Sequence, residues 1–392
     1  MSEQQLYDLA PALELMAFGL LLALGPLCWV WWRNRGNGPS RRLQALCVLT
    51  LFLTFDLVLF GAFTRLTDSG LGCPDWPGCY GTFSPLAAHS QISEAQAAMP
   101  TGPVTHGKAW VEMIHRYLAT TVGVLIIAMT VMSWKQAMAA RRAGEPEQAQ
   151  GALSPWWPSL TLVWACLQGA LGAWTVTWKL FPAIVTLHLL GGTGLLALLA
   201  IPASAMSLKQ AALLPALIGK RLRTALWLCL ALLVLQVSLG GWVSTNYAVL
   251  ACTTFPTCQG SWWPSMDFAQ ALQIWRPLGL LADGSHISFE ALTTIHYTHR
   301  LMAYVVVLSL AGLWAAMRHA PALAKQRRML GFFAVLQVLT GLSNVVLDWP
   351  LVAAVLHTGG AAALVTIVVW SLAVTRSDVT SHPDQETARR PA

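Results

Sequence analysis

The chain has 392 residues, of which 56% are hydrophobic and only 10% are charged. A soluble domain typically carries about 25% charged residues, so this composition indicates a membrane protein. The net charge of +7 does not indicate nucleic-acid binding, because the basic residues cluster in short segments between apolar runs. The N-terminal sequence resembles neither a cleaved signal peptide nor an Arg-rich transit peptide. We therefore expect a multi-pass protein of the bacterial inner (plasma) membrane.

Nine apolar runs are long enough to cross a bilayer, which takes about 20 residues each. In chain order these runs cover residues 13–32, 44–64, 109–134, 156–178, 182–206, 224–245, 292–317, 329–347 and 351–374. The eighth run is barely long enough, and Asp348 and Pro350 after it predict a tight turn. The runs predict an all-α polytopic membrane protein.

The basic residues predict the orientation of these helices. Of the 24 Lys and Arg residues, 18 lie in one alternating set of connecting segments and 4 in the opposite set. Because Lys and Arg concentrate in cytoplasmic loops, the N-terminus is expected in the periplasm and the C-terminus in the cytoplasm. Two long loops, 65–108 and 246–291, then fall on the periplasmic side.

The sequence contains an internal repeat. Four motifs recur in the same order: Cys73–Cys79 with Cys252–Cys258, Glu112-x-x-His115-Arg116 with His296-x-x-His299-Arg300, Gln168 with Gln337 twenty positions before His188 and His357, and a Gly-Gly pair after each of these two histidines. The repeat predicts two four-helix halves related by a pseudo-twofold axis along the membrane normal. The expected divisions are an extra N-terminal transmembrane helix with its inner loop (1–43), the first half (44–206), an inner linker (207–223), the second half (224–374) and an inner polar tail (375–392).

Four histidines lie inside predicted helices: His115, His188, His299 and His357. Each stands about six or seven residues past the predicted helix start, which at about 1.5 Å per residue is roughly 10 Å deep. A lone histidine in a membrane is commonly a polar contact between helices, but four at one depth favour metal ligation. A zinc or copper site would bring three or four ligands together. Two histidines per half, on alternate helices, instead favour one bis-histidine haem in each half.

Glu112 lies one helical turn from His115 on the same face. A carboxyl group inside a membrane is costly and by default functional, and beside a haem it could move a proton. The alternative is an interfacial glutamate bound to Lys108 or Trp110. Because the second half has His296 at this position, we expect one half to be equipped for chemistry and the other for holding a haem.

Arg116 and Arg300 each follow one of these histidines. Arginine is well suited to carboxylates, so both arginines are candidate partners of haem propionates. Packing against carboxylates of the outer loops is an equally good alternative.

The eight cysteines fall into two groups. Cys73, Cys79, Cys252 and Cys258 lie in the predicted periplasmic loops, where disulfides Cys73–Cys79 and Cys252–Cys258 are expected. Each closes only a short loop, so its stabilisation is modest, and both a structural and a redox role stay open. The cysteines within helices are expected to be small buried apolar residues: Cys28, Cys47, Cys166 and Cys229.

Together these motifs resemble the haem A synthase family, which includes the Cox15 and CtaA proteins. The resemblance spans about residues 44–374, and these residues carry it: Gly61–Gly70 (GAFTRLTDSG), Cys73–Cys79, Glu112-x-x-His115-Arg116, His188, Cys252–Cys258, His299-Arg300 and His357. The family oxidises a ring methyl of haem O to a formyl group, giving haem A for cytochrome c oxidase. A second, b-type haem carries electrons.

The resemblance implies a role for each of these residues. His115 and His188 would bind the substrate haem, Glu112 would be the catalytic carboxylate, and His299 and His357 would ligate haem b. Haem O synthase, oxidase assembly factors and a second copy of the chain are the partners it suggests. The chain departs from the family's eight helices by its extra first helix, and His296 could compete with His299 as a ligand.

Two other functions compete with this one. A di-haem membrane cytochrome b would only transfer electrons, but it has no need of a carboxyl group at one haem alone. A thiol–disulfide oxidoreductase would use the outer cysteines but leaves the four intramembrane histidines unexplained. The electron acceptor and the source of oxygen stay open.

Overall fold

The computed structural model describes residues 10–144 and 154–377. In that part of the chain, nine helices are long and apolar enough to cross a membrane. They are α1 (Ala10–Arg33), α2 (Pro39–Leu66), α4 (His106–Arg142), α5 (Trp156–Thr177), α6 (Pro182–Gln210), α7 (Lys220–Thr245), α9 (Phe289–Ala316), α10 (Ala324–Val346) and α11 (Leu351–Ala373). Every predicted run coincides with one of these helices, so the all-α polytopic fold is confirmed.

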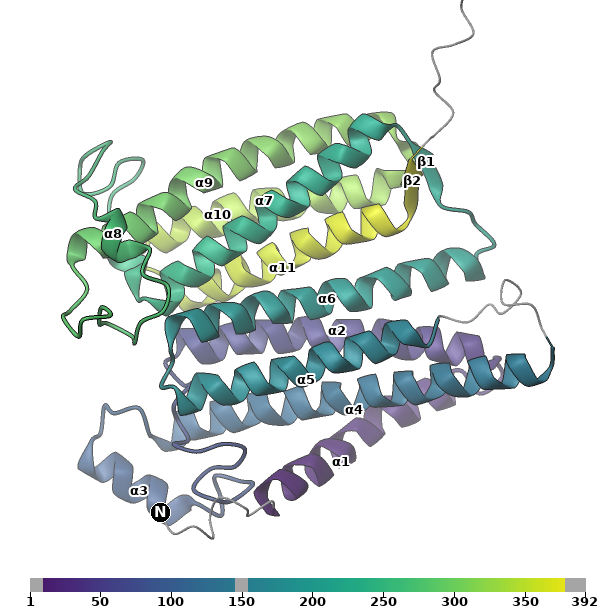
Figure 1. Ribbon diagram of the computed structural model, residues 1–392, viewed down its shortest axis with the longest axis horizontal. Coiled ribbons are helices and arrows are strands. Elements are labelled where there is room, and N and C mark those ends of the chain that lie inside the picture. The colour runs from purple at the N-terminus through teal and green to yellow at the C-terminus, as the bar shows by residue number, and fades with distance from the viewer. Residues whose placement is uncertain (1–9, 145–153, 378–392) are drawn as a thin grey trace, which may run out of the picture.

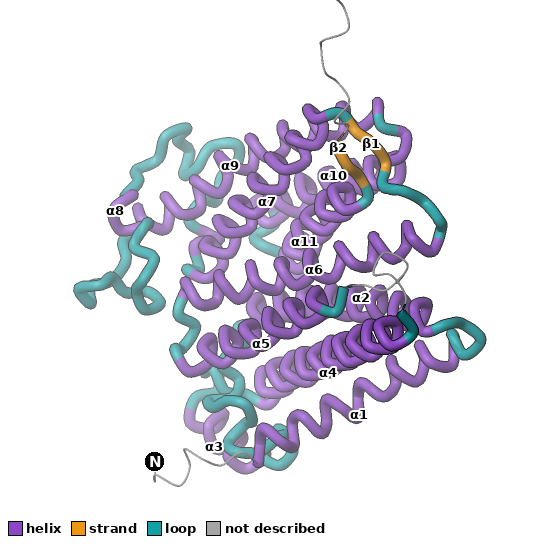
Figure 2. Tube along the Cα trace, turned by 45° about the vertical axis from the view of Figure 1, so that its right-hand side comes forward, coloured by secondary structure: helices purple, strands orange, loops and turns teal. Residues whose placement is uncertain are grey.

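The long helices run side by side, and the connecting segments gather at their two ends (Figure 1). One end carries the short helices α3 (His89–Ala98) and α8 (Phe268–Ala271), together with both cysteine loops. We call it the loop end. The strands β1 (Ala216–Ile218) and β2 (Thr375–Ser377) lie at the opposite end (Figure 2). The two long loops predicted on one side of the membrane therefore share one end of the molecule.

The long helices pack in two groups with the same pattern of neighbours. In the first group α2 and α5 each contact both α4 and α6, and in the second α7 and α10 each contact both α9 and α11. The groups meet where α2 contacts α11 and where α6 contacts α7 and α11. This matching pattern supports the proposed division into two four-helix halves, with α1 added beside α4 and α2.

Two pairs of repeat-equivalent residues touch each other at the loop end. Arg65 Nη2 donates a hydrogen bond of 2.6 Å to the backbone oxygen of Ser244, and the Tyr247 hydroxyl donates one of 2.7 Å to Asp68 Oδ1. Both pairs are 179 positions apart, the same separation as the first cysteines of the two loops. Contact between equivalent positions is what a twofold axis between two halves produces, so these contacts support the pseudo-twofold relation.

Helices α4 and α9 begin three residues earlier than the apolar pattern predicted, at His106 and Phe289. The reason is capping, because the side chains of Thr105 and Ser288 each accept a hydrogen bond from a backbone N–H of the first turn. His115 and His299 are consequently the tenth and eleventh residues of their helices. His188 and His357 are each the seventh residue of α6 and α11, as expected.

The predicted tight turn before α11 is confirmed. Asp348 and Trp349 both have positive φ values, of 52° and 62°. The turn before α6 is built in the same way, with Lys179 at 49° and Leu180 at 59°. These turns reverse the chain within a few residues and bring α5 against α6 and α10 against α11.

A small sheet that the sequence did not predict joins the linker to the tail. Strand β1 pairs with β2 in parallel, with Ala216 opposite Thr375. Arg223 Nη1 adds a hydrogen bond of 2.7 Å to the backbone oxygen of Thr375. The linker and the first residues of the tail therefore form one unit, whereas residues 378–392 of the predicted tail lie outside the described residues.

The prediction for the cysteines within helices is half wrong. Cys47 and Cys229 are buried, but Cys28 and Cys166 are exposed. In a membrane protein the outer helix faces meet lipid, which is as apolar as a protein core. A cysteine in an apolar helix therefore fits either environment.

Candidate functional site

Each of the four intramembrane histidines lies against a glycine of a neighbouring helix. A Cβ atom added to these glycines would lie 3.0–3.4 Å from a ring atom of the facing histidine. The pairs are Gly61 with His115, Gly172 with His188, Gly240 with His299 and Gly341 with His357. Larger residues would crowd the imidazoles at these four positions, so the glycines make room for the rings.

The histidines come together in two pairs, one in each half. His115 and His188 lie in the first group of helices, and His299 and His357 lie in the second. The first pair projects from α4 and α6, and the second from α9 and α11. The structure therefore places two of the four histidines in each half, as the repeat predicted, and their joint ligation of one haem per half stays a prediction.

The rings of the second pair are oriented through Nδ1. The side-chain Nε2 of Gln236 lies 3.1 Å from Nδ1 of His299, and Oγ1 of Thr340 lies 3.0 Å from Nδ1 of His357. Such contacts leave Nε2 of each ring to face a ligand. In the first pair, Nδ1 of His188 is buried and has no hydrogen-bond partner among the described residues. The two sites therefore differ in how firmly their rings are held.

Both carboxylate oxygens of Glu112 are bound by donors. Oε2 accepts a hydrogen bond of 2.8 Å from the backbone N–H of Cys73, and Oε1 lies 2.5 Å from Nη2 of Arg116. Glu112 is only 4% exposed, and Lys108 Nζ donates to the backbone oxygen of Gly102 instead. The alternative of an interfacial glutamate bound to Lys108 or Trp110 is therefore wrong. Glu112 belongs to the contact between α4 and the first cysteine loop.

In the second half, His296 takes the place of Glu112. Its Nδ1 lies 3.3 Å from the backbone nitrogen of Cys252, and its Nε2 lies 3.2 Å from Nε of Arg300. A backbone N–H and a guanidinium can only donate hydrogen bonds, so both ring nitrogens face donors. A neutral imidazole carries one N–H, so it accepts a hydrogen bond from only one of these two groups. Both ring nitrogens nevertheless face groups of the protein, which disfavours His296 as a competitor of His299.

Arg116 and Arg300 bind backbone carbonyls of the cysteine loops. Nη1 of Arg116 donates to the backbone oxygens of Pro77 and Gly78. Arg300 donates to the backbone oxygens of Cys252, Thr254 and Thr257 over 2.6, 2.8 and 3.2 Å. These carbonyls are a kind of partner that the sequence did not suggest. A contact with haem propionates stays a prediction for both arginines.

The structure forms both expected disulfides, Cys73–Cys79 and Cys252–Cys258. All four of these cysteines are buried, with at most 1% of their surface exposed. Thiol–disulfide exchange requires that an attacking thiolate reach a sulfur atom. This burial argues against a thiol–disulfide oxidoreductase and favours loops that the disulfides hold in shape.

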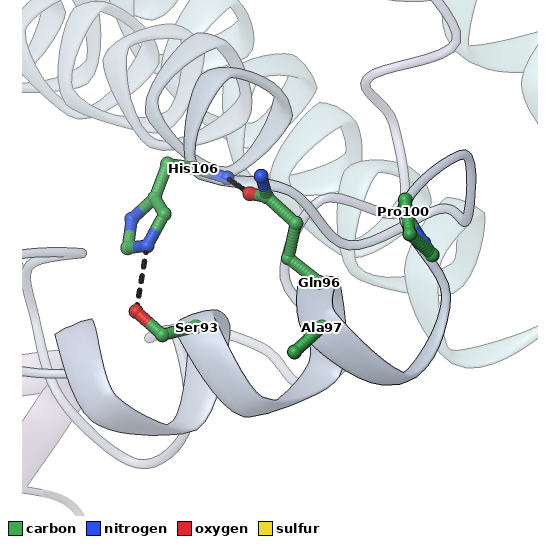
Figure 3. Close-up of a pocket in the computed structure, with 5 residues that line it drawn as sticks. All are labelled: Ser93, Gln96, Ala97, Pro100 and His106. Atoms are coloured by element: carbon green, nitrogen blue, oxygen red, sulfur yellow. Dashed lines mark hydrogen bonds between the residues drawn. The ribbon is translucent and has the colours of Figure 1, made fainter.

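The loop histidines lie apart from the two pairs. Nε2 of His106 is 2.9 Å from the hydroxyl of Ser93, beside a pocket at the loop end (Figure 3). The ring of His89 lies 4.6 Å from that of His106. Within residues 10–144 and 154–377, no group of three or more His, Cys, Asp or Glu side chains is placed to hold a metal ion. This result disfavours the zinc or copper alternative and leaves the paired histidines as the candidate site.

Sequence reasoning missed two features of the loop end. Gly61 and Gly240 were not recognised as neighbours of the histidines, although each stands twelve positions before the first cysteine of its loop. Arg276 lies in the second predicted outer loop, yet it is 1% exposed and its Nη2 donates a hydrogen bond of 2.6 Å to Asn246 Oδ1. Burial lowers the pKa of its guanidinium. No motif or spacing in the sequence pointed to Arg276.

A family model and several known proteins match most of the chain. The sequence model of the COX15-CtaA family, described as a cytochrome oxidase assembly protein, matches residues 44–369. A protein of Shewanella oneidensis named haem A synthase is 37% identical over 345 residues, which cover 84% of this chain and 95% of the relative. A haem A synthase of Chelativorans sp. is 31% identical, over 82% of this chain and 87% of the relative. A haem A synthase of Allorhizobium ampelinum is 28% identical, over 86% of this chain and 92% of the relative. The chain therefore belongs to the COX15-CtaA family.

Proposed function

We propose that the protein is a membrane oxidoreductase that converts haem O to haem A by oxidising a ring methyl to a formyl group. Relatives named haem A synthase match the chain over most of its length. The observation that carries the proposal is an asymmetry between two otherwise matched sites. Both halves hold a histidine pair against glycines, but a buried carboxylate lies one turn from only one pair. One site is suited to chemistry and the other to holding a haem.

The first half is proposed to bind the substrate, haem O, between His115 and His188. Glu112 would then act on the reacting carbon, either by accepting a proton or by stabilising positive charge that develops there. A carboxylate has about four lone-pair positions, so its bonds to Cys73 and Arg116 leave capacity for a further contact. Those bonds also fix its orientation, which is what such a role requires.

The second half is proposed to hold haem b through Nε2 of His299 and of His357. Its residues fit the group, because both rings are oriented through Nδ1 and because Gly240 and Gly341 leave room beside them. When bound, haem b would supply one-electron transfer. The protein's part is to hold the two imidazoles facing each other and to keep His296 engaged with Cys252 and Arg300.

We propose that the loop end faces the periplasm of a bacterial cell and that the C-terminus faces the cytoplasm. The distribution of basic residues supports this orientation, and disulfides at the loop end fit an oxidising compartment. Haem A would be delivered to cytochrome c oxidase. Haem O synthase, assembly factors of the oxidase and a second copy of the chain are proposed partners.

Extraction of the pigment tests the proposed activity. Protein purified from cells that make haem O is expected to release haem B together with haem O or haem A, because one site holds a cofactor and the other a substrate or product. The measurement is chromatography of the acid-extracted haems followed by mass spectrometry. Two equivalents of haem B with neither haem O nor haem A would instead favour the di-haem electron carrier.

A Gly240→Val substitution is expected to lower the haem b content. A Cβ at this position would lie 3.0 Å from Cε1 of His299, and the γ-methyl groups would press further on the ring. Overpacking typically costs about 1–3 kcal/mol, which corresponds to a loss of affinity of about 5- to 150-fold. The measurement is the haem b absorbance per protein.

The matched control for this variant is Gly312→Val. Gly312 lies on α9, and a Cβ added there meets nothing within 4 Å. Both variants place a β-branched residue in a membrane helix, so they share the cost of helix propensity. Equal haem b contents in the two variants would show that the space beside His299 does not matter.

A further inference from the structure

Helix α1 packs along α4 through one face. Its buried residues Pro11, Leu15, Gly19 and Ala23 recur at intervals of four, which places them on one side of the helix. The first turns of α1 lie at the loop end, beside the segment that carries the first cysteine loop (Figures 1 and 2). The helix therefore meets both α4 and that loop.

The approach of α1 to α4 is unusually close at Gly19. A Cβ at this position would lie 2.4 Å from Cγ2 of Thr120 and 2.8 Å from its Cβ. Such distances are far inside van der Waals contact, which between carbon atoms is optimal at about 3.5–4.0 Å. Any larger side chain at Gly19 would push the two helices apart.

Between Gly19 and its N-terminus, α1 also contacts the first cysteine loop. Leu15 shares a hydrophobic cluster with Cys73, Cys79 and Met113. The Cβ of Pro11 lies 3.3 Å from the position that a Cβ of Gly78 would take. The start of α1 thus covers the loop that the disulfide closes.

An aromatic contact extends this cover to the end of the loop. The ring of Phe18 lies 4.7 Å from that of Tyr117 and 6.2 Å from that of Phe83. The Tyr117 hydroxyl in turn donates a hydrogen bond of 2.6 Å to the backbone oxygen of Phe83. Phe18 therefore packs on the link between α4 and the loop.

The second cysteine loop is much less covered. Six of the nine residues 252–260 are exposed, against three of the nine residues 73–81. The buried cluster at the second loop comprises Cys252, Cys258 and Tyr297, with Met266 packed against it. Each loop has its own disulfide and its own arginine bound to backbone carbonyls. We therefore attribute the difference in exposure to the elements that pack over each loop.

We infer that α1 is a positioning element that holds the Cys73–Cys79 loop and, through it, the carboxylate of Glu112. The loop donates the Cys73 N–H to Glu112 and accepts hydrogen bonds from Arg116, which also binds Glu112. Movement of the loop would therefore remove the Cys73 N–H from the carboxylate. It would also free Arg116 from the loop carbonyls that hold it beside Glu112. The link to Glu112 rests on the proposed function, whereas the cover of the loop does not. The family match begins at residue 44, after α1, so this role adds to what the family core provides.

Reduction of the two disulfides in the full-length protein tests the cover directly. Membranes are treated with graded dithiothreitol, free thiols are blocked, and each cysteine is quantified by peptide mass spectrometry. In the unmodified protein Cys252–Cys258 is expected to be reduced faster than Cys73–Cys79. In Gly19→Leu the reduction of Cys73–Cys79 is expected to be at least about tenfold faster, since an opening that costs 1.4 kcal/mol less is about ten times more populated. Reduction of Cys252–Cys258 should be unchanged.

The control is Gly25→Leu on the same helix, because a Cβ at Gly25 meets nothing within 4 Å. It should leave both reduction rates unchanged. Equal rates in Gly19→Leu and Gly25→Leu would overturn the inference. So would equal acceleration of both disulfides in Gly19→Leu, because that would indicate general destabilisation.

A second variant tests the inference independently in case Gly19→Leu does not fold. Phe18→Ala removes the aromatic contact and is expected to accelerate reduction of Cys73–Cys79 alone. Leu13→Ala, at a residue of α1 that is 68% exposed, is its control. If Phe18→Ala leaves Cys73–Cys79 as slow to reduce as in its control, the inference is wrong.

The haem composition of cells tests whether α1 positions Glu112. In a strain that depends on the Gly19→Leu protein for haem A, haem O should accumulate severalfold while haem b in the second half is retained. Selective loosening of the first loop with unchanged haem A would show that α1 does not position Glu112, which overturns that part of the inference. If Glu112→Gln also made haem A normally, the proposed role of Glu112 would be the one that fails.

Discussion

A Glu112→Gln variant is expected to retain haem b and to lose haem A formation by about 10²–10⁴-fold, the usual cost of removing a general acid or base. Glutamine keeps the size of the side chain but cannot take up a proton or stabilise positive charge as a carboxylate does. Its amide can accept a hydrogen bond from Cys73 or Arg116 but not from both in the present arrangement. Haem O or a partly oxidised intermediate should therefore accumulate. The measurement is the haem profile of a strain whose haem A synthase is this variant.

The repeat supplies a matched control for this experiment. His296→Gln alters the equivalent position, which also bridges a cysteine-loop N–H and an arginine. Because His296 is proposed neither as a ligand of haem b nor as an acid or base, this variant should retain haem b and still form haem A. Wild-type haem A levels in Glu112→Gln would make Glu112 a structural residue and would favour the electron carrier. An equal loss in both variants would mean that loop packing, and not the carboxylate, limits the reaction.

Replacing His299 or His357 by Ala is expected to remove haem b almost completely. A bis-histidine haem loses half of its protein ligation when one imidazole is removed, and Ala leaves a void beside Gly240 or Gly341 that nothing replaces. The measurement is the reduced-minus-oxidised spectrum of the purified variants, compared at equal protein. Haem A formation should fall as well, because its electrons are proposed to pass through this site.

His296→Ala is the control for the ligand variants. His296 lies three residues from His299 on α9, but both its nitrogens face donors, so its loss should leave haem b in place. A full haem b spectrum in both His299→Ala and His357→Ala would refute their assignment as ligands. Loss of haem b in His296→Ala alone would move the ligand to that residue.

The sequence by itself determined the membrane architecture. Each spanning segment must satisfy its own backbone hydrogen bonds inside the bilayer, so a long apolar run has little choice but to form a helix. All nine runs are helices in the structure. The pairing of His115 with His188, and of His299 with His357, was also predictable, because the repeat carries the two motifs in the same order in both halves.

Helix ends and loop conformations depended on features that apolar patterns do not record. Helices α4 and α9 extend further than predicted because Thr105 and Ser288 cap them. The two-stranded sheet joins Ala216 to Thr375 across more than 150 positions of chain. Local composition carries no signal for such a pairing, since strand partners are chosen by the packing of the helices that lead to them.

Only the tertiary structure decided what surrounds the candidate site. The contact of Glu112 with Arg116 follows from helical spacing, but its bond to Cys73 comes from a loop 39 positions away and depends on how that loop folds back on α4. The cover provided by α1 depends on a close approach at Gly19, which looks in the sequence like any other glycine of an apolar helix. An apolar helix can face lipid or protein equally well, because both are apolar. Hydropathy therefore places a helix in the membrane, whereas side-chain packing decides which neighbour it meets.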